Sequence, residues 1–385
     1  MFRGCCSKVI YALGAFSVFI ILTELIDVDT TLSKCKFFMC TTKNTHQQHA
    51  SDMEKRNLKL DISDRVELTK FQKNLSERYQ LMHQHESSNK KPRLFIDPRQ
   101  VVNIPGHITL GLTIINKKGE KKLDPSFLYK MKINLLSLLT YSSGDPIHFV
   151  IITDKNSQEN VKNIMDNLVS QYTTEGVVLR KWRKIKSVPK IKFSYVDCED
   201  IIQIAPDFFS AMRANSVQGA GYTAGVSYTE DLFYIAPIYH KAFASLDKII
   251  FLDSKDLEFR SDVKLLEMEF DKMSETALIG IAPDLTPHYR GKLEKYLELH
   301  PNSSLGQQGP GQGYNSGVVL YRLDKMRNST LYNKYTAPTG VDALMSKYLY
   351  EMFLAEQDWL TNLGFTHPQL FYNLPCQFNR QTSIR

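Results

Sequence analysis

The sequence predicts an α/β fold in which a mostly parallel, Rossmann-like sheet is flanked by helices on both faces. Three observations lead to this prediction. Short continuous apolar segments, among them IHFVIITD and DKIIFLD, have the length and composition of strands that are buried on both faces. Segments with apolar residues at helical spacing alternate with these strands. Polar residues stand where the strands end, at the edge where open α/β sheets bind their ligands.

The expected elements follow in β-α-β-α-β order from His107 onward. HITLGLTII is the first strand, and Pro125–Tyr141, with apolar residues at helical spacing, is the first helix. IHFVIITD is the second strand, residues 156–171 form the second helix, and IKFSYVD is the third strand. Residues 230–243 (EDLFYIAPIYHKAF) are expected to form a helix that leads into DKIIFLD, the fourth strand. Four polar residues stand at the carboxyl ends of the first three strands: Asn116, Lys117, Asp154 and Asp197.

The N-terminal residues predict a membrane anchor. Residues 9–26 (VIYALGAFSVFIILTELI) carry one charge, Glu24, and follow Arg3 and Lys8. This length and this positive flank fit a helix that crosses a bilayer with its N-terminus in the cytosol. A cleaved signal peptide is the alternative, but no small-x-small cleavage motif follows the apolar segment. We therefore expect a single-pass type II membrane protein.

Four regions are expected along the chain. Residues 1–8 are the cytosolic tail, residues 9–26 are the transmembrane anchor, and residues 27–106 are polar and have the composition of a stalk. Residues 107–385 form the folded domain, on the lumenal side of the membrane. N-glycosylation sequons agree with this topology, although such tripeptides also arise by chance. They begin at Asn74, Asn302 and Asn328.

Cysteine spacing and charge argue against two other classes of protein. None of the 6 cysteines stands in the paired CxxC spacing of a structural zinc site. Cys35 and Cys40 can close a small disulfide loop in an oxidising lumen, and Cys5 and Cys6 are placed for palmitoylation. The net charge is +7, but lysines and arginines are spread along the chain and do not form a stripe with interleaved aromatic residues. We therefore expect no nucleic-acid partner.

The segment KIIFLDSKDLEF, residues 248–259, ends a buried strand on two carboxylates, Asp253 and Asp256. A helix cap, a solvated turn and a metal site all produce such a pattern. Two aspartates at the mouth of a sheet can hold a hard divalent cation whose shell is completed by substrate phosphates. A charge pair on a solvated turn is the plain alternative.

Two further segments carry polar groups of the right kind for a ligand. In GPGQGYNSGVVLYRLDKM, residues 309–326, a Gly-rich loop precedes YNSG and then the strand VVLYRL. Small residues let a ligand approach the backbone, and Asn315 and Ser316 offer donors and acceptors for hydroxyl groups, although turn chemistry also explains NSG. FLAEQDWLTNLGF, residues 353–365, is an expected amphipathic helix whose acidic residues are in most proteins simply solvated.

In this order on this sheet, the three segments resemble those of the GT-A glycosyltransferases of family 8. In that family a DxD motif binds Mn²⁺ and the diphosphate of a nucleotide sugar, and [FY]NSGV and [DE]QD segments enclose the donor sugar. The sequence is similar above all to the family's xyloside α-1,3-xylosyltransferases, which are type II membrane enzymes of the endoplasmic reticulum. The similarity runs from His107 to about Arg380 and includes GIAPDLTPHYR, GYNSGVVLYRLDKMR, EQDWLTNLGF and HPQLFYNLPCQFNRQ.

The resemblance implies a retaining glycosyltransferase with a GT-A domain in the lumen of the endoplasmic reticulum. Its implied reaction moves α-xylose from UDP-xylose to the 3-hydroxyl of xylose in Xyl-Glc O-glycans on EGF-like repeats of Notch-type proteins. Gln357 of the EQD segment is neutral and would be a poor covalent nucleophile. Front-face attack by the acceptor hydroxyl, assisted by the departing phosphate, therefore fits better than a double displacement.

The resemblance also implies site residues, position by position. Asp253 and Asp256 correspond to the DxD aspartates, with Mn²⁺, or Mg²⁺ in its place, as the cofactor. Gln357 and Asp358 correspond to the catalytic segment. The implied acceptor contacts are Tyr289 and Trp359. The implied donor-binding residues are Ile115, Asn116, Lys117, Ser254, Lys255, Asn315, Ser316, Gly317, Leu354 and Gln357.

Two departures from the family pattern bear on activity. Ser254 and Lys255 give DxxD spacing, so both carboxylates reach one ion only where the backbone bulges. The family's third metal ligand is a histidine in a C-terminal HGN segment, and the sequence ends at Arg385 without one. A second hypothesis is therefore a catalytically silent lumenal protein that binds glycosylated EGF repeats. A third is a relative that transfers a hexose, because pocket dimensions decide the donor sugar.

Overall fold

The computed structural model describes residues 94–115, 123–183, 189–216, 231–307 and 311–381. These residues belong to one compact unit. The expected anchor, most of the stalk, Asn74, Asn116 and Lys117 lie outside the described residues. Within the described ranges, no helix is both long enough and apolar enough to span a bilayer.

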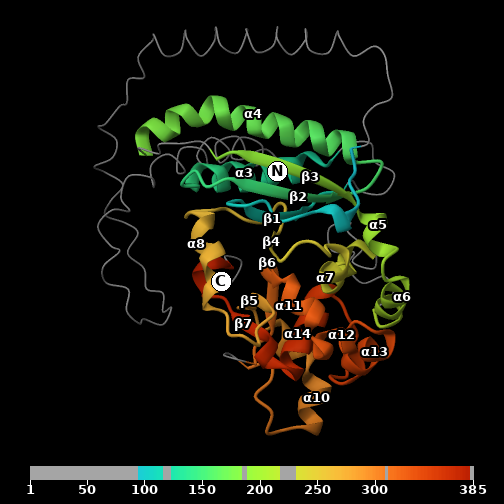
Figure 1. The fold of residues 1–385 in the computed structure, drawn as a ribbon. Coiled ribbons are helices and arrows are strands. Elements are labelled where there is room, and N and C mark those ends of the chain that lie inside the picture. Colours follow the sequence, from blue (N-terminus) through green and yellow to red (C-terminus); the bar gives the residue numbers. More distant parts are fainter. Residues whose placement is uncertain (1–93, 116–122, 184–188, 217–230, 308–310, 382–385) are drawn as a thin grey trace, which may run out of the picture. The chain divides into compact units, whose positions relative to one another are not determined.

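Seven strands form one mixed sheet in the order β3-β2-β1-β4-β6-β5-β7 (Figure 1). The strands β1 to β4 are parallel, β6 runs antiparallel to both of its neighbours, and β7 is parallel to β5. The predicted mostly parallel sheet is therefore confirmed. The bounds of the strands are β1 Ile108–Thr113, β2 Ile147–Thr153, β3 Ile191–Asp197, β4 Lys248–Leu252, β5 Ile279–Pro283, β6 Tyr314–Arg322 and β7 Phe371–Asn373.

The central strands are apolar because both faces of the sheet are covered. Every residue of β2 is buried. Along β4, Ile249 and Phe251 belong to one apolar cluster, while Ile250 and Leu252 belong to the other. The alternation follows from the opposite directions of successive side chains in a strand. The chain thus builds two cores, one on each face of the sheet.

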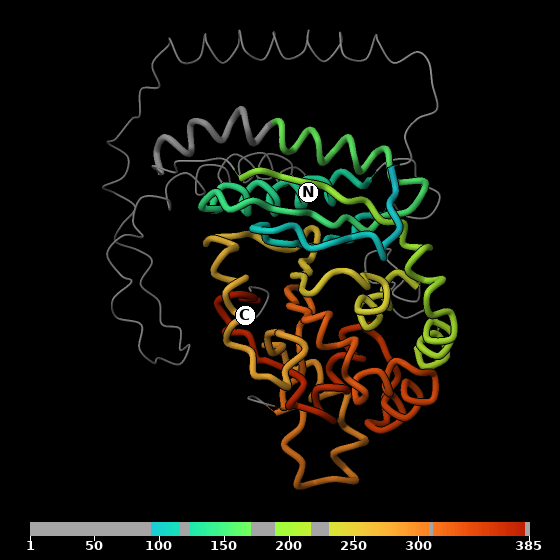
Figure 2. The backbone as a smooth tube through the Cα atoms, viewed as in Figure 1, coloured from blue at the N-terminus to red at the C-terminus, as the bar shows by residue number. Residues whose placement is uncertain are grey.

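The helices divide between these two cores. Apolar residues of α3 and α4 pack in one cluster with β2, and those of α6, α7, α12, α13 and α14 pack in the other. Figure 2 shows the early strands together in cyan and green and the helices after β6 in orange and red. The α-helices are α3 Pro125–Tyr141, α4 Gln158–Arg183, α5 Cys198–Ile202, α6 Pro206–Ala214, α7 Tyr239–Ala242, α8 Val263–Glu267, α9 His288–Lys292, α10 Glu294–Leu299, α11 Leu323–Asn328, α12 Thr330–Tyr335, α13 Pro338–Ser346 and α14 Glu356–Thr366.

Three expectations about elements need correction. The helix expected over residues 230–243 is broken into the 3₁₀ turns Asp231–Tyr234 and Ala236–Ile238 and the four-residue α7, because Pro237 has no N–H to donate inside a helix. The NSG residues lie on β6 itself and not in a loop before it. The last helix, α14, begins at Glu356, three residues later than Phe353.

Candidate active site

The turn after β4 is fixed to three neighbouring elements. The Asn134 side chain of α3 donates to the Asp253 carbonyl oxygen at 2.6 Å. The Ser254 hydroxyl, which is buried, donates to the carbonyl oxygen of Thr113 at the end of β1 at 2.5 Å. The Asp253 N–H donates to the Gly317 carbonyl oxygen of β6 at 2.8 Å. The turn therefore holds a defined position at the carboxyl end of the sheet.

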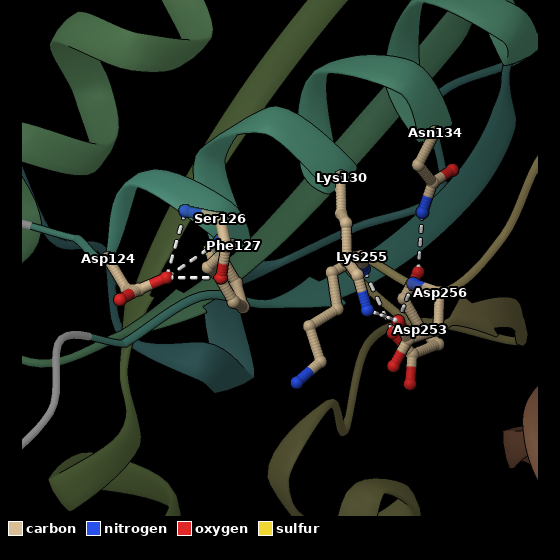
Figure 3. Close-up of polar contacts among 8 residues, drawn as sticks. All are labelled: Asp124, Ser126, Phe127, Lys130, Asn134, Asp253, Lys255 and Asp256. Atoms are coloured by element: carbon tan, nitrogen blue, oxygen red, sulfur yellow. Dashed lines mark hydrogen bonds and ion pairs between the residues drawn. The ribbon is translucent and has the colours of Figure 1, made fainter. Parts of the chain in front are cut away.

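The two carboxylates of this turn have different environments (Figure 3). Asp253 Oδ1 accepts the N–H groups of Lys255 at 2.9 Å and Asp256 at 3.0 Å, so it closes the turn in the way that an Asx turn does. Asp256 Oδ1 accepts the Lys130 ammonium at 2.9 Å, and its side chain is 50% exposed. One oxygen of Asp253 therefore stabilises the turn itself, as the turn alternative predicts.

The fit of a divalent cation to this turn can be tested on the donor set. Carboxylate oxygens are the correct chemistry for Mn²⁺ or Mg²⁺. However, Asp253 and Asp256 each have one oxygen committed within the protein, and a lysine stands at Asp256. The described residues include no group of three or more His, Cys, Asp or Glu side chains that could hold a metal ion. The described residues therefore do not fit a complete metal centre, and the metal assignment stays a prediction.

The strand β6 carries a bulge at the NSG residues. Its pairing with β5 places Val319 opposite Ile281 but Asn315 opposite Ala282, so residues 316–318 have no partner on β5 in that register. Within the bulge, Asn315 Oδ1 accepts the Gly317 N–H at 3.1 Å. Bulges redirect side chains and are frequent next to active sites. Turn chemistry is one sequence-based explanation of NSG, and the structure shows a β-bulge at these residues.

The C-terminal segment holds this bulge in place. The buried side chain of Asn379 donates to Asn315 Oδ1 at 2.9 Å. Gln381 donates to the Pro283 carbonyl oxygen at the end of β5 at 3.0 Å and accepts the Leu285 N–H at 2.9 Å. Asn379 and Gln381 belong to the HPQLFYNLPCQFNRQ motif but are not among the predicted site residues. Asn379 reaches Asn315 across 64 residues of sequence, and Gln381 reaches its partners across more than 90.

Helix α14 meets the bulge through Gln357. Gln357 Oε1 accepts the Ser316 N–H at 3.0 Å and lies 3.3 Å from the Ser316 hydroxyl. Its Nε2 lies 3.4 Å from the Tyr289 hydroxyl oxygen. The structure thus brings together Ser316 and Gln357, which the sequence predicted on separate segments.

Asp358 lies behind Gln357 in the protein interior. It is fully buried, and its Oδ1 accepts the Tyr289 hydroxyl at 2.8 Å. Its Oδ2 accepts the N–H groups of Phe353 at 2.6 Å and Leu354 at 2.8 Å. Both oxygens are committed, so this arrangement does not present Asp358 as a nucleophile. The carboxylate instead fixes the residues that precede α14.

The residue between these partners has an unusual backbone. Ala355 has φ 51° and ψ −123° at the N-cap of α14, a region that glycine occupies far more readily than alanine. Such a conformation persists where its surroundings over-determine it. The two N–H bonds to Asp358 supply that constraint immediately before Ala355.

A second acidic residue, Glu356, begins the EQD segment but is not among the predicted site residues. It is partly buried, and the Ser316 hydroxyl lies 3.5 Å from its Oε1. Burial raises the pKa of Glu356 from 4.5 to about 8, and the nearby Asp358 charge adds to the increase. Its place before Gln357 in the EQD segment was the signal that could have identified it.

The remaining predicted residues have varied positions. Ile115, at the end of β1, and Leu354, before α14, are partly buried. Tyr289 and Trp359 have 0% exposure, and the Trp359 ring packs edge-on against Phe208 and Tyr332. This burial does not fit direct contact with an acceptor, because neither ring reaches the surface. The described sequon residues Asn302 and Asn328 are both exposed.

Comparisons with known proteins can now be set beside this geometry. No protein-family model matches the chain. Xyloside xylosyltransferase 1 is 35% identical in Mus musculus over 161 residues, which are 41% of this chain and 41% of that protein. The Homo sapiens protein is 36% identical over 160 residues, 41% of this chain and 40% of that protein. The matched segment thus spans about two fifths of the length of these curated relatives.

Structural comparison extends the similarity. The crystal structure of mouse xyloside xylosyltransferase 1 in its apo form matches with a TM-score of 0.55 at 26% identity, and the match covers 71% of this chain and 86% of that one. A third curated relative, the Homo sapiens xylosyl- and glucuronyltransferase LARGE2, is 34% identical over 140 residues, 36% of this chain and 18% of that protein. The fold is therefore a GT-A-like α/β fold, and the chain is related to glycosyltransferases.

Proposed function

We propose that this homologue of xyloside xylosyltransferase 1 is a retaining glycosyltransferase that takes α-xylose from UDP-xylose. Its proposed acceptor is the 3-hydroxyl of xylose in Xyl-Glc O-glycans on EGF-like repeats of Notch-type proteins. The observation that carries the proposal is the bond between Ser316 and Gln357, 41 residues apart, at the carboxyl edge of the sheet. Hydroxyl and amide groups in such an arrangement can recognise the hydroxyls of a sugar.

The proposed donor site is formed by elements that the fold holds together. The bulge of β6 presents Asn315 and Ser316, and α14 presents Gln357 against it. The turn with Ser254 and Lys255 is joined to the same bulge through the hydrogen bond from Asp253 to Gly317. A nucleotide sugar that spans the turn and the bulge would place its diphosphate near the turn and its sugar near Gln357.

The proposed transfer is a front-face substitution. The bond from the anomeric carbon to the diphosphate oxygen breaks with its electron pair on that oxygen, and a bond forms from the acceptor hydroxyl oxygen to the same carbon. The acceptor proton passes to the departing diphosphate, so atoms and charges balance. Gln357 is uncharged and Asp358 has both oxygens engaged, which favours this route over a covalent glycosyl-enzyme. A trapped xylosyl adduct on Asp358 would overturn it.

The proposed location is the membrane of the endoplasmic reticulum, with the folded domain in the lumen. Support for this proposal comes from the sequence of residues 9–26 and from its positive flank. The exposure of Asn302 and Asn328 is compatible with glycosylation at both sequons. Protease protection of the domain in sealed microsomes tests the topology, and digestion of the domain in intact vesicles would contradict it.

A second candidate function is a silent lumenal protein that binds glycosylated EGF repeats. The ion pair between Lys130 and Asp256 favours it, because a lysine stands beside a carboxylate that a metal would need. The deciding experiment incubates the full chain with UDP-xylose and a Xyl-Glc-modified EGF repeat, with and without Mn²⁺, and follows product mass and linkage. The enzyme adds one pentose in α-1,3 linkage, whereas the silent protein binds the repeat and adds nothing.

Two additions make this assay specific. UDP-glucose as a competing donor tests transfer of a hexose, which the proposal excludes. The variant Asp256→Asn is expected to lose transfer while its far-ultraviolet circular dichroism is unchanged, because that side chain is exposed and holds no core contact. Normal turnover by Asp256→Asn would remove that carboxylate from the mechanism.

A further inference from the structure

One face of α3 lies against the turn that follows β4 (Figure 3). Asn134 donates to the Asp253 carbonyl oxygen, and Lys130, one helical turn earlier, donates to Asp256 Oδ1 at 2.9 Å. The Lys255 ammonium of the turn lies 5.8 Å from the centre of the Phe127 ring, on the same helix. Residues three, four and seven apart share a helix face. The fold therefore brings two lysines and two aspartates together at the mouth of the sheet.

Two of the four carboxylate oxygens that a divalent cation could bind already accept hydrogen bonds from backbone amides and from Lys130. Asp253 Oδ1 receives two N–H groups, and Asp256 Oδ1 receives the ammonium of Lys130. Lys130 is thus the cation that Asp256 binds in this structure.

Charge at this turn is balanced inside the protein. Lys130 and Lys255 supply two positive charges, and Asp253 and Asp256 supply two negative charges. A nucleoside diphosphate brings further negative charge that has to be neutralised by cationic groups at the site. An ammonium offers three hydrogen-bond donors and binds phosphate well as a compact charge. An ammonium that turns from its aspartate to a phosphate oxygen can supply this attraction without an added ion.

We propose that Lys130, oriented by Asp256, and Lys255 form a diphosphate-binding site that takes UDP without a divalent cation. This inference rests on the proposed function, because it assigns the diphosphate end of the same donor site. The Lys130–Asp256 pair is exposed, with side chains 55% and 50% accessible. Exposed pairs are weak, so the ammonium can turn from the carboxylate to a phosphate oxygen at little cost. Under this proposal the DxxD turn, one residue longer than the family's DxD, uses lysine ammonium groups as the cations that bind the diphosphate.

The experiment is a calorimetric titration of the full chain with UDP, once in EDTA and once in Mn²⁺. We expect UDP to bind in EDTA and Mn²⁺ to change the dissociation constant by less than about threefold. Lys130→Met should weaken UDP binding in EDTA by about tenfold or more, since a charge-assisted hydrogen bond to phosphate is lost. The matched control is Lys132→Met on the same helix, which should bind UDP as the unmodified chain does.

Two outcomes overturn the inference, and they differ in what they say of the proposed function. If UDP binds only with Mn²⁺, and Lys130→Met equals the unmodified chain, the donor site is metal-dependent and the proposed function stands. If UDP binds in neither condition, both the inference and the donor site fail. Tight binding in EDTA that Lys130→Met and Lys255→Met leave unchanged also rejects the lysines as the site.

Discussion

The Tyr289 hydroxyl donates to Asp358 Oδ1 at 2.8 Å, and neither side chain is exposed to solvent. Asp358 also accepts two backbone N–H groups just before α14, next to the strained Ala355. A buried carboxylate needs hydrogen-bond donors in place of water, and Asp358 has three of them. The pair therefore determines where α14 begins, and with it the position of Gln357.

The first prediction concerns Asp358→Asn. The carboxylate offers two acceptor oxygens to its three donors, whereas the amide offers one oxygen and one NH₂ group. At least one of the present donors then faces the NH₂ group, and its buried hydrogen bond is lost. We expect a loss of about 1–3 kcal/mol in the free energy of unfolding, measured by urea denaturation, together with loss of transfer.

The control for this prediction is Tyr372→Phe, which removes a phenol that donates to buried Glu269 at 2.7 Å away from the site. Tyr372→Phe should lower stability but leave kcat and UDP-xylose KM unchanged in the remaining folded protein. Equal effects of the two variants on transfer per folded molecule would show that Asp358 acts only through stability.

The second prediction concerns Asn379→Ala. Asn315 Oδ1 would lose one of its two donors and keep only the Gly317 N–H, so the bulge of β6 would gain freedom. We expect UDP-xylose KM to rise by roughly five- to thirtyfold, the equivalent of about 1–2 kcal/mol, with a smaller change in kcat. The exposed neighbour Gln377→Ala is the control and should leave both constants unchanged. A kcat effect without a KM effect would contradict a role in donor binding.

The third prediction concerns pH and Glu356. Its pKa of about 8 in the folded chain lies above the ordinary 4.5, so the folded state keeps a proton that the unfolded chain releases. Stability therefore falls as pH rises from about 4.5 to about 8, by up to about 1.4 kcal/mol per unit. Glu356→Gln removes this slope and should become more stable relative to the unmodified chain as pH rises. Urea unfolding in EDTA at several pH values measures the difference, and parallel curves would reject the burial of this charge.

The fourth prediction concerns Ala355→Gly. Glycine adopts φ 51° without the clash that a Cβ introduces, and this gain opposes the greater freedom of glycine in the unfolded chain. We expect the variant to be as stable as the unmodified chain or more stable by up to about 1 kcal/mol. Ala343→Gly, at an exposed position inside α13, is the control and should lose about 1 kcal/mol. Similar losses in both variants would show that Ala355 is not strained.

The strands of the sheet could be predicted from local sequence, whereas several contacts of the site could not. Strand β2 is apolar at all but two polar positions and β4 is apolar after Lys248, and such continuous segments have few alternatives in an α/β chain. Pro237 is the local signal for the break in residues 230–243, where apolar spacing alone predicts one continuous helix.

The missed site residues share a physical cause. Lys130 meets Asp256 across 126 residues, and Asn379 meets Asn315 across 64, so neither pair leaves a pattern in nearby sequence. The carboxylates of DSKD are predicted metal ligands, and in the structure one oxygen of each accepts hydrogen bonds from backbone amides or from a lysine. The family resemblance indicated these carboxylates as site residues, whereas their hydrogen bonds to backbone amides and to Lys130 depend on tertiary packing.

Two contacts of the C-terminal segment can form only late in synthesis. They are the pairing of β7 with β5 and the hydrogen bond from Asn379 to Asn315. Strands β1 to β4 leave the ribosome first and can pair with one another in parallel. The residues that secure the bulge of β6 emerge only near the end of translation, and contacts between distant segments form slowly. A nascent chain can thus form its four parallel strands before the residues that hold the bulge of β6 in place have been made.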